Sequence, residues 1–417
     1  MKTPNLAALV LLVGLSACDA SNRAGEIDAG ALCTAGLADC NADGVCETDI
    51  TSPANCGGCN LICPSGPHST PMCSHGTCSI ECDPGFGDCD GNPGNGCESD
   101  LTAPGTCGSC GNSCGAACVN GACESCDTDL AMGSTDPLDA AHAMGICGDS
   151  LVAARWVMPN GSPPPTDTPE MVQNFDLGHG ILPDFGTNLK PREGDQLFVM
   201  SSGRARRPGD PDFESPGGFD KTYESVTPDG FPRPSPACPG VGVDPTKPIN
   251  DPEAIELDLK VPGWAKGFAF DFDFYTYEWP SFVCSEFNDF FVANLSPPPV
   301  GATDGSISFD SMGNPISVNA ALVNVCSCPG GPPCNAQGHS YACARGSAEL
   351  VGTGFEIDGG HAATGWLTST APVTPGQTIT LRLSVYDSGD HVLDSTVLVD
   401  HFRWLPRSPV VTTEPIP

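Results

Sequence analysis

KGFAFDFDFYTYEW, from Lys266 to Trp279, is the stretch that indicates the fold of the larger part of this chain. Phenylalanines recur there at every second position, with small or acidic residues between them: Phe268, Phe270, Phe272 and Phe274. Side chains alternate between the two faces of a β-strand. The spacing therefore predicts a strand with the phenylalanines on one buried face and Asp271 and Asp273 on the other.

Similar strand patterns lie on both sides of this stretch. Further strands are expected at Asp195–Ser201, Ile255–Val261, Phe287–Leu295, Thr378–Tyr386 and Thr396–Trp404. One short helix is expected over 136–144, because Asp136 can cap it and Pro137 suits its first turn. Short strands, long Pro and Gly loops and little helix predict a mainly β fold, with a C-terminal β-sandwich of jelly-roll type. We expect this β domain over 136–407 and a flexible tail over 408–417.

The charge of the chain excludes some classes of partner. Its 417 residues contain 17 Lys and Arg against 51 Asp and Glu, which gives a net charge of −34. Such a surface repels nucleic acid and anionic lipid head groups. A nucleic-acid partner is therefore not expected.

The N-terminus indicates export from the cytosol. Met1-Lys2 precedes an apolar stretch, Leu6–Leu15, which is too short to span a bilayer and is typical of a signal peptide. Leu15-Ser16-Ala17-Cys18 resembles the bacterial lipobox, which implies cleavage before Cys18 and a lipid on its sulfur. The alternative is a plain secretory signal with an incidental cysteine.

On the lipobox interpretation, residues 1–17 are a lipoprotein signal peptide and 18–32 a lipid-anchored linker. The membrane is then a partner through the lipid on Cys18, because no later run of about 18 apolar residues could span it. The expected location is the envelope of a Gram-negative-type bacterium, at the outer membrane or cell surface rather than the inner membrane.

The cysteines form an internal repeat. Removing Cys18 from the 25 cysteines leaves 24, an even number. Sixteen of them make two units with the shared spacing C-x9-C-x2-C-x3-C. Unit one, over 33–78, contains Cys33, Cys40, Cys46, Cys56, Cys59, Cys63, Cys73 and Cys78. Unit two, over 82–123, contains Cys82, Cys89, Cys97, Cys107, Cys110, Cys114, Cys118 and Cys123, and a linker is expected over 124–135.

Disulfides are the favoured chemistry for these small, irregular repeats. An exported protein meets an oxidising compartment, and the repeats contain too few large apolar residues to form a core. Zinc is the alternative that C-x2-C suggests, but each unit has one such pair where a zinc site needs two. Parity predicts that Cys126 pairs with one of the seven cysteines of the β domain: Cys147, Cys238, Cys284, Cys326, Cys328, Cys334 and Cys343. The connectivity stays open.

Three segments of the C-terminal region resemble the choice-of-anchor L domain of bacterial surface proteins. They are LFVMSSG from Leu197, FDFDFYTYEWPSFVCSEFNDFFVANL from Phe270, and YDSGDHVLDSTVLVD from Tyr386. The resemblance covers roughly residues 136–405. It implies a protein displayed at the cell surface, and the family has no common activity that we could transfer to this chain.

Calcium is the candidate cofactor. Hard oxygen ligands collect in two short segments, as calcium requires: Glu278, Glu286, Asn288 and Asp289, then Asp387, Asp390, Asp394 and Asp400. The alternative is that these residues only cap loops and turns.

A hydrolase is the alternative to a binding protein. Ser388 or Ser395 with His391 and Asp390 could form a triad, and Glu278 with Glu286 could act as a glycosidase pair. Proximity in sequence does not make a catalytic site, so no catalytic residue is expected. We therefore expect a non-catalytic binding or adhesion domain on a disulfide-rich stalk, with a glycan or a cell-surface protein as its partner.

Overall fold

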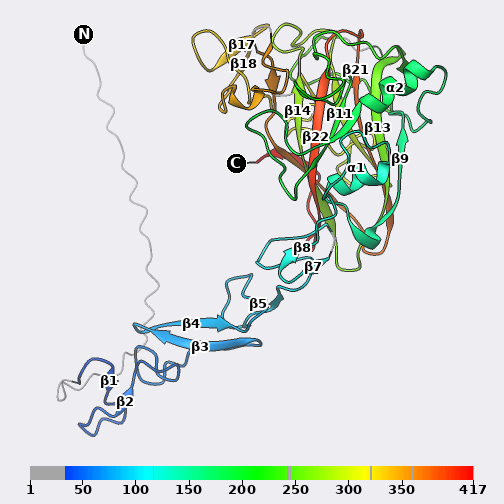
Figure 1. Cartoon of the computed structure of the whole chain (residues 1–417). Helices are drawn as coiled ribbons and strands as arrows, with labels where there is room; N and C mark the ends of the chain where they lie inside the picture. Colours follow the sequence, from blue (N-terminus) through cyan, green and yellow to red (C-terminus); the bar gives the residue numbers. More distant parts are fainter. Residues whose placement is uncertain are drawn as a thin grey trace, which may run out of the picture. The chain divides into compact units, whose positions relative to one another are not determined.

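The chain forms two compact units. The computed structural model describes residues 33–115, 117–241, 244, 246–319, 322–357 and 360–416 (Figure 1). The predicted signal peptide, the anchored linker and Cys18 lie outside these residues. One unit contains Met1–Asp83 and Gly91–Cys97, and the other contains Pro84–Asp90 and Glu98–Pro417. The boundary falls inside the second repeat, because the disulfide Cys82–Cys97 joins both of its cysteines to the first unit.

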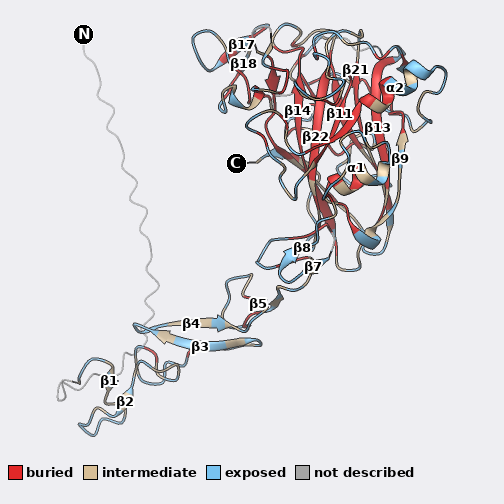
Figure 2. Ribbon diagram, viewed as in Figure 1, coloured by how far each residue is buried: buried red, intermediate tan, exposed pale blue. Residues whose placement is uncertain are grey.

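Hairpins and crosslinks make up the first unit. Its strands are β1 (Leu37–Ala38), β2 (Thr48–Asp49), β3 (Ser69–Ser74) and β4 (Thr77–Cys82), paired as β1 with β2 and β3 with β4. Figure 2 shows β3 and β4 with intermediate and exposed residues only. Cys56 and Cys63 are buried, while Leu61 and Ile62 are exposed. Disulfides therefore stabilise this unit in place of a hydrophobic core.

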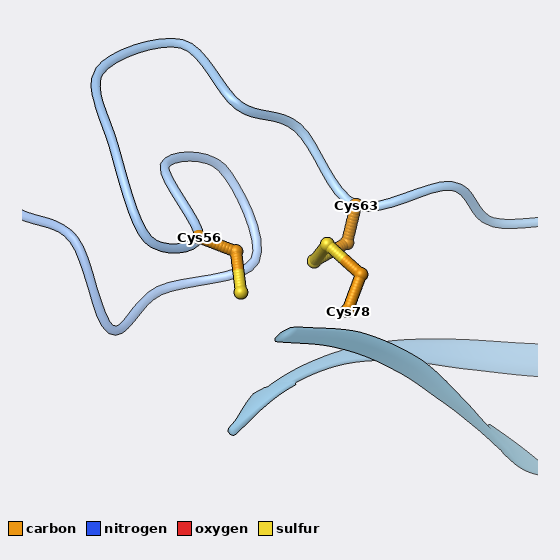
Figure 3. A group of neighbouring side chains, drawn as sticks. All are labelled: Cys56, Cys63 and Cys78. Atoms are coloured by element: carbon orange, nitrogen blue, oxygen red, sulfur yellow. A yellow bond between two sulfur atoms is a disulfide. The ribbon is translucent and has the colours of Figure 1, made fainter. Parts of the chain in front are cut away.

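The structure pairs all 24 expected cysteines in twelve disulfides. Both repeats use the same order, in which the first cysteine pairs with the third, the second with the fifth, the fourth with the seventh and the sixth with the eighth. Figure 3 shows Cys63 bonded to Cys78 with Cys56 beside them. Cys56 is itself bonded to Cys73, so these neighbouring sulfurs are not free thiolates for zinc.

Residues 124–135, expected to be a linker, are tied to the β region. Cys126 forms a disulfide with Cys147, as parity suggested. The buried carboxylate of Asp127 accepts hydrogen bonds from the backbone N–H groups of Asp195 (2.7 Å) and Gln196 (2.9 Å). The rest of the second repeat carries the hairpins β5 (Phe86–Gly87) with β6 (Ser99–Asp100) and β7 (Cys118–Val119) with β8 (Ala122–Cys123).

Two antiparallel sheets form the β region, which confirms the predicted sandwich class. The seven-stranded sheet has the order β10 (His179–Leu182), β11 (Leu197–Ser201), β22 (Ser395–Leu405), β14 (Gly267–Thr276), β20 (Leu367–Pro372), β23 (Thr412–Pro415), with β19 (Ala362–Ala363) beside β14. The six-stranded sheet has the order β12 (Glu224–Ser225), β13 (Ile249–Lys260), β21 (Thr378–Asp387), β15 (Phe290–Ser296), β16 (Ile316–Ser317), with β9 (Leu151–Val157) beside β13. A separate hairpin joins β17 (Cys334–Ala336) to β18 (His339–Tyr341).

The phenylalanines of β14 lie between the sheets, as their spacing predicts. All four are buried in one cluster with apolar residues of β13, β15 and β21. The rings of Phe272 and Phe291, from opposite sheets, are 4.7 Å apart between centroids. Figure 2 shows β13, β14, β21 and β22 largely in the buried colour.

The opposite face of β14 is also buried, which the alternation pattern alone did not indicate. Asp271 accepts a hydrogen bond from Arg403 (3.0 Å), and Asp273 accepts one from Thr364 (3.1 Å). Loops cover this face and pack Phe185 against Tyr275. The expected flexible tail is wrong for residues 412–415, because β23 pairs with β20 and extends the sheet.

Helices are short. Helix α1 (Pro137–Ala143) begins after Asp136, whose side chain caps it, as predicted. Helix α2 (Pro169–Leu177) was not predicted, although Thr168 caps it and Pro169 opens it. Single 3₁₀ turns lie at Gly148–Ser150 and Ala348–Leu350. Among the described residues, no helix has the length and apolar character needed to cross a membrane.

Candidate functional site

Four acidic residues meet at one end of the sandwich. Asp289 directly precedes β15 and Asp387 ends β21, and the pairing of Phe290 with Tyr386 places the two acids opposite each other. In the other sheet, Thr276 at the end of β14 pairs with Ser395 at the start of β22. Glu278 and Asp394 flank that pair. We call Glu278, Asp289, Asp387 and Asp394 the carboxylate cluster.

One hydrogen bond joins the two halves of the carboxylate cluster. The backbone N–H of Asp289 donates to the Glu278 carboxylate at 3.1 Å. This bond connects the end of β14 in one sheet with the start of β15 in the other. The cluster therefore spans the gap between the sheets.

The carboxylate cluster is buried and poorly paired. Its four side chains are at most 2 % exposed. Both carboxyl oxygens of Asp289, one of Asp387 and one of Asp394 lack a hydrogen-bond partner, as does the neighbouring Ser395 hydroxyl. Two basic side chains nearby are engaged elsewhere: Lys221 bonds Glu253 (3.1 Å) and His391 bonds Asp251 (3.0 Å). Buried charges without partners are costly, so this arrangement needs protons or a cation.

The protonation of the cluster reflects this cost. Burial, together with the charges of neighbouring carboxylates, raises the pKa of Glu278, Asp387 and Asp394 well above the ordinary range. Burial also raises the pKa of Asp289 to about 7. The nearby Ser395 and Asp387 side chains act to lower the pKa of Asp289, but the effect of burial is larger. Neither side chain meets Asp289 with hydrogen-bond geometry. Proton loss is thus resisted throughout the cluster.

The donor set of the cluster suits calcium. Calcium binds six to eight oxygens and tolerates varied geometry, and carboxylates are its usual protein ligands. The buried Asn288 adds an amide oxygen that also has no partner. A bound calcium ion would offset part of the charge of the cluster and link the two sheets at this end. Glu278, Asn288, Asp289, Asp387 and Asp394 are therefore the residues that could hold it.

Three other residues of the expected calcium set do not belong to this buried group, although the charge of Asp390 acts on Glu278, Asp289 and Asp387. Glu286 is exposed, and Asp390 is partly exposed and caps Val392 (3.1 Å). The expectation for Asp400 is wrong, because it lies within β22 opposite Asp271. Its carboxylate accepts backbone hydrogen bonds from Arg192, Glu193 and His401.

The residues considered for hydrolysis do not form a catalytic arrangement. Both ring nitrogens of His391 face carboxylates, with Nδ1 at 3.0 Å from Asp251 and Nε2 at 3.9 Å from Glu224. In the part of the chain that the structure describes, His391 makes no hydrogen bond to Ser388 or Ser395. The glycosidase pair is also separated by environment, since Glu278 is buried and Glu286 exposed.

A second cluster was not predicted from the sequence. Asp220, Asp251 and His391 bring one ligand atom each to within 4.8 Å of one another. His391 also lines two surface cavities of about 830 and 580 Å³. One signal was available: Pro252 within strand β13 favours a bulge, and the pairing with β21 is irregular between Asn250 and Glu253.

Comparison with known proteins gives one family match. No curated protein matches the chain. Among solved structures, the cleaved adhesin domain K2 of Lys-gingipain aligns with 60% of this chain and 97% of that domain, at 10% identity and a TM-score of 0.22, values too low to support an inference. Residues 243–402 match the model of the choice-of-anchor L domain, which fits a cell-surface protein. This match confirms the resemblance over residues 243–402 and does not extend over 136–242.

Proposed function

We propose that this chain is a lipid-anchored cell-surface protein that displays a calcium-stabilised β-sandwich on a disulfide-rich stalk, where the sandwich binds a partner. The observation that carries the proposal is the carboxylate cluster, four buried acids with unpaired oxygens at the ends of strands from both sheets. The match to the choice-of-anchor L domain supports the location at the surface.

Calcium accounts for a cluster that is otherwise unfavourable. Four carboxylates in a buried site repel one another, and the raised pKa values express that repulsion and the loss of water. A divalent cation reverses the sign of the interaction. Because β14 and β22 belong to one sheet and β15 and β21 to the other, calcium would hold this end of the sandwich closed. Loops at this end would then be ordered for a partner.

The lipid on Cys18 would attach the protein to the membrane. The disulfides leave none of the other 24 cysteines unpaired, which fits a separate role for Cys18. Replacing Cys18 by alanine, or inhibiting the prolipoprotein signal peptidase with globomycin, should move the protein out of the membrane fraction or block its maturation. Unchanged membrane association in both experiments would contradict the anchor.

A glycan or a cell-surface protein is the proposed partner. The cavities beside His391 are polar and open, which suits hydroxyl-rich ligands. The test is a glycan-array and whole-cell binding screen of the full mature chain, in millimolar calcium and in chelator. Binding should appear in calcium and weaken in chelator and in an Asp289→Asn variant. The absence of binding in calcium would contradict the partner, and no calcium-dependent change in melting temperature would contradict the calcium site.

A further inference from the structure

The second cluster has the geometry of a metal site of a different kind. Nδ1 of His391 is 3.0 Å from Oδ2 of Asp251 and 3.4 Å from Oδ1 of Asp220. Zinc bonds to imidazole nitrogen and carboxylate oxygen are about 2.0–2.2 Å long, so neighbouring ligand atoms of one ion stand about 3–3.5 Å apart. Both measured separations fall in this range without any movement of the side chains.

A metal ion could bind all three ligand atoms of this cluster, whereas a single proton on Nδ1 of His391 could not. One Nδ1–H group can donate a good hydrogen bond to Asp251 or to Asp220, but two carboxylates converge on it. The third pair, the carboxylate oxygens of Asp220 and Asp251, lies within 4.8 Å, so one ion between the three atoms could reach all of them. The other ring nitrogen, Nε2, faces the carboxylate of Glu224 at 3.9 Å. A carboxylate on the far side of the ring is the usual companion of a metal-bound histidine.

The backbone holds the two carboxylates in place. Asp251 has a positive φ of 49° in the irregular part of β13, and the N–H of Lys221 donates to its Oδ1 at 3.0 Å. Thr222, a β-branched residue, has a φ of 69°, and its N–H donates to Oδ1 of Asp220. A bulge re-aims a side chain, and a β-branched residue is strained at positive φ. Both carboxylates are thus oriented by neighbours other than His391.

The cluster is open to solvent on the cavity side. Asp251 is buried at its base, whereas His391 is 29 % and Asp220 55 % exposed. His391 and Glu224 line both the 830 and the 580 Å³ cavities, and Asp220 lines the larger one. A metal held by three ligands would therefore keep coordination positions facing the larger cavity, as open sites do.

We propose that Asp220, Asp251 and His391 bind one divalent metal ion of the zinc class beside the larger cavity. The imidazole nitrogen favours a borderline metal over calcium, which prefers oxygen alone. Glu224 lies outside the ligand set and faces Nε2 of His391 at 3.9 Å. This site shares no residue with the carboxylate cluster, although the charge of Asp251 acts on Asp289 and Asp394, and the inference does not depend on calcium binding there.

The test is zinc titration of the full mature chain by isothermal calorimetry in millimolar calcium, after removal of metals with chelator. One zinc ion per chain should bind. His391→Gln and Asp220→Asn should each weaken it by about 10- to 100-fold or more, since loss of even an outer-shell partner has that effect. Cobalt in place of zinc should give a visible absorption spectrum that both variants lose.

His401→Gln is the matched control. His401 also bonds a buried carboxylate, Asp271 at 2.9 Å, but the guanidinium of Arg403 occupies the space beside it. This variant should bind zinc as the wild type does. Absence of zinc binding at millimolar zinc, or wild-type affinity in His391→Gln, would overturn the proposal.

The calcium-dependent rise in melting temperature separates the two sites and reports folding. His391→Gln should keep that rise, while Asp289→Asn should lose it and still bind zinc. If His391→Gln does not fold, Asp220→Asn decides, because its side chain is exposed. Wild-type zinc affinity in a folded Asp220→Asn variant would then overturn the assignment.

Discussion

Replacing Asp289 by asparagine should stabilise the protein when calcium is absent and remove the stabilisation that calcium provides. The change keeps the shape of the side chain and removes one charge from the carboxylate cluster. In the metal-free protein that charge is buried without a hydrogen-bond partner, so its removal relieves a cost. With calcium bound, the same charge attracts the ion, so its removal weakens binding.

The magnitude follows from the pKa of Asp289. Burial raises it from 3.8 to about 7, and each pKa unit corresponds to about 1.4 kcal/mol, so ionisation of Asp289 costs the metal-free fold about 4 kcal/mol near neutral pH. For the wild type, calcium at 100 times its Kd should add about 2.7 kcal/mol. At roughly 2–4 °C per kcal/mol, calcium should raise the wild-type Tm by roughly 5–10 °C.

The pH dependence has a definite sign. The folded pKa of Asp289 lies above its unfolded value, so the metal-free fold binds more protons than the unfolded chain. The contribution of Asp289 to its stability should be greatest below about pH 4 and fall as the pH rises to about 7. Saturating calcium should remove the part of the fall in stability that comes from the cluster, because the cation favours the ionised carboxylates, while the part from Asp400, whose pKa is raised to about 8 outside the cluster, should remain.

The assay is thermal unfolding followed by circular dichroism, in chelator and in millimolar calcium, for both proteins. Asp400→Asn is the control, because burial raises the pKa of Asp400 to about 8 outside the cluster. It should keep the full calcium response. If Asp289→Asn retains the wild-type rise in Tm, or if the metal-free wild type shows no loss of stability between about pH 4 and 7, the reasoning is refuted.

Three further changes test the fold. Burial acts to raise the pKa of Asp271, but the hydrogen bond to His401 and the charge of Arg403 outweigh it and hold the pKa at about 2. The resulting stabilisation of about 2 kcal/mol should be lost as the pH falls from about 4 to 2, and urea unfolding of Asp271→Asn should lack this transition; an unchanged profile would contradict it. Phe272→Ala should lower the unfolding free energy in urea by about 3–5 kcal/mol, and a loss under about 1 kcal/mol would place the ring outside the core. Replacing Cys126 and Cys147 together by alanine opens a loop with a sequence separation of 21 and should cost about 3 kcal/mol by calorimetry, whereas an unchanged transition would show that residues 124–135 act as a free linker.

The sequence predicted the strands themselves better than the loops and side chains that pack against them. Alternation in Lys266–Trp279 identified β14 and the face that its phenylalanines occupy. It could not show that the opposite face is covered, because the covering groups, such as Thr364 and Arg403, come from distant segments. Tail residues 412–415 gave no periodic signal, and only pairing with β20 makes them a strand.

The sequence indicated which kinds of residue could form the candidate calcium site. It did not indicate which of these residues come together. Oxygen ligands at strand ends were visible in the sequence, but the register between strands selects which of them meet. Asp289 and Asp387 face each other because Phe290 pairs with Tyr386, while Asp400 lies along β22 and meets Asp271. The second cluster needed a bulge at Asp251, and Pro252 was its only local sign.

Because both repeats share this disulfide order, cleavage of one peptide bond within either repeat does not divide the chain into two separate pieces. In the first repeat the closed loops overlap in series: 33–46, 40–59, 56–73 and 63–78. Every peptide bond from Cys33 to Cys78 therefore lies inside at least one covalent ring, and the same holds from Cys82 to Cys123. A protease that cleaves once within either range leaves both ends joined. If the chain is anchored as proposed, a single cut among residues 33–126 would release the β region only in the short segments 79–81 or 124–125, unless the disulfides are first reduced.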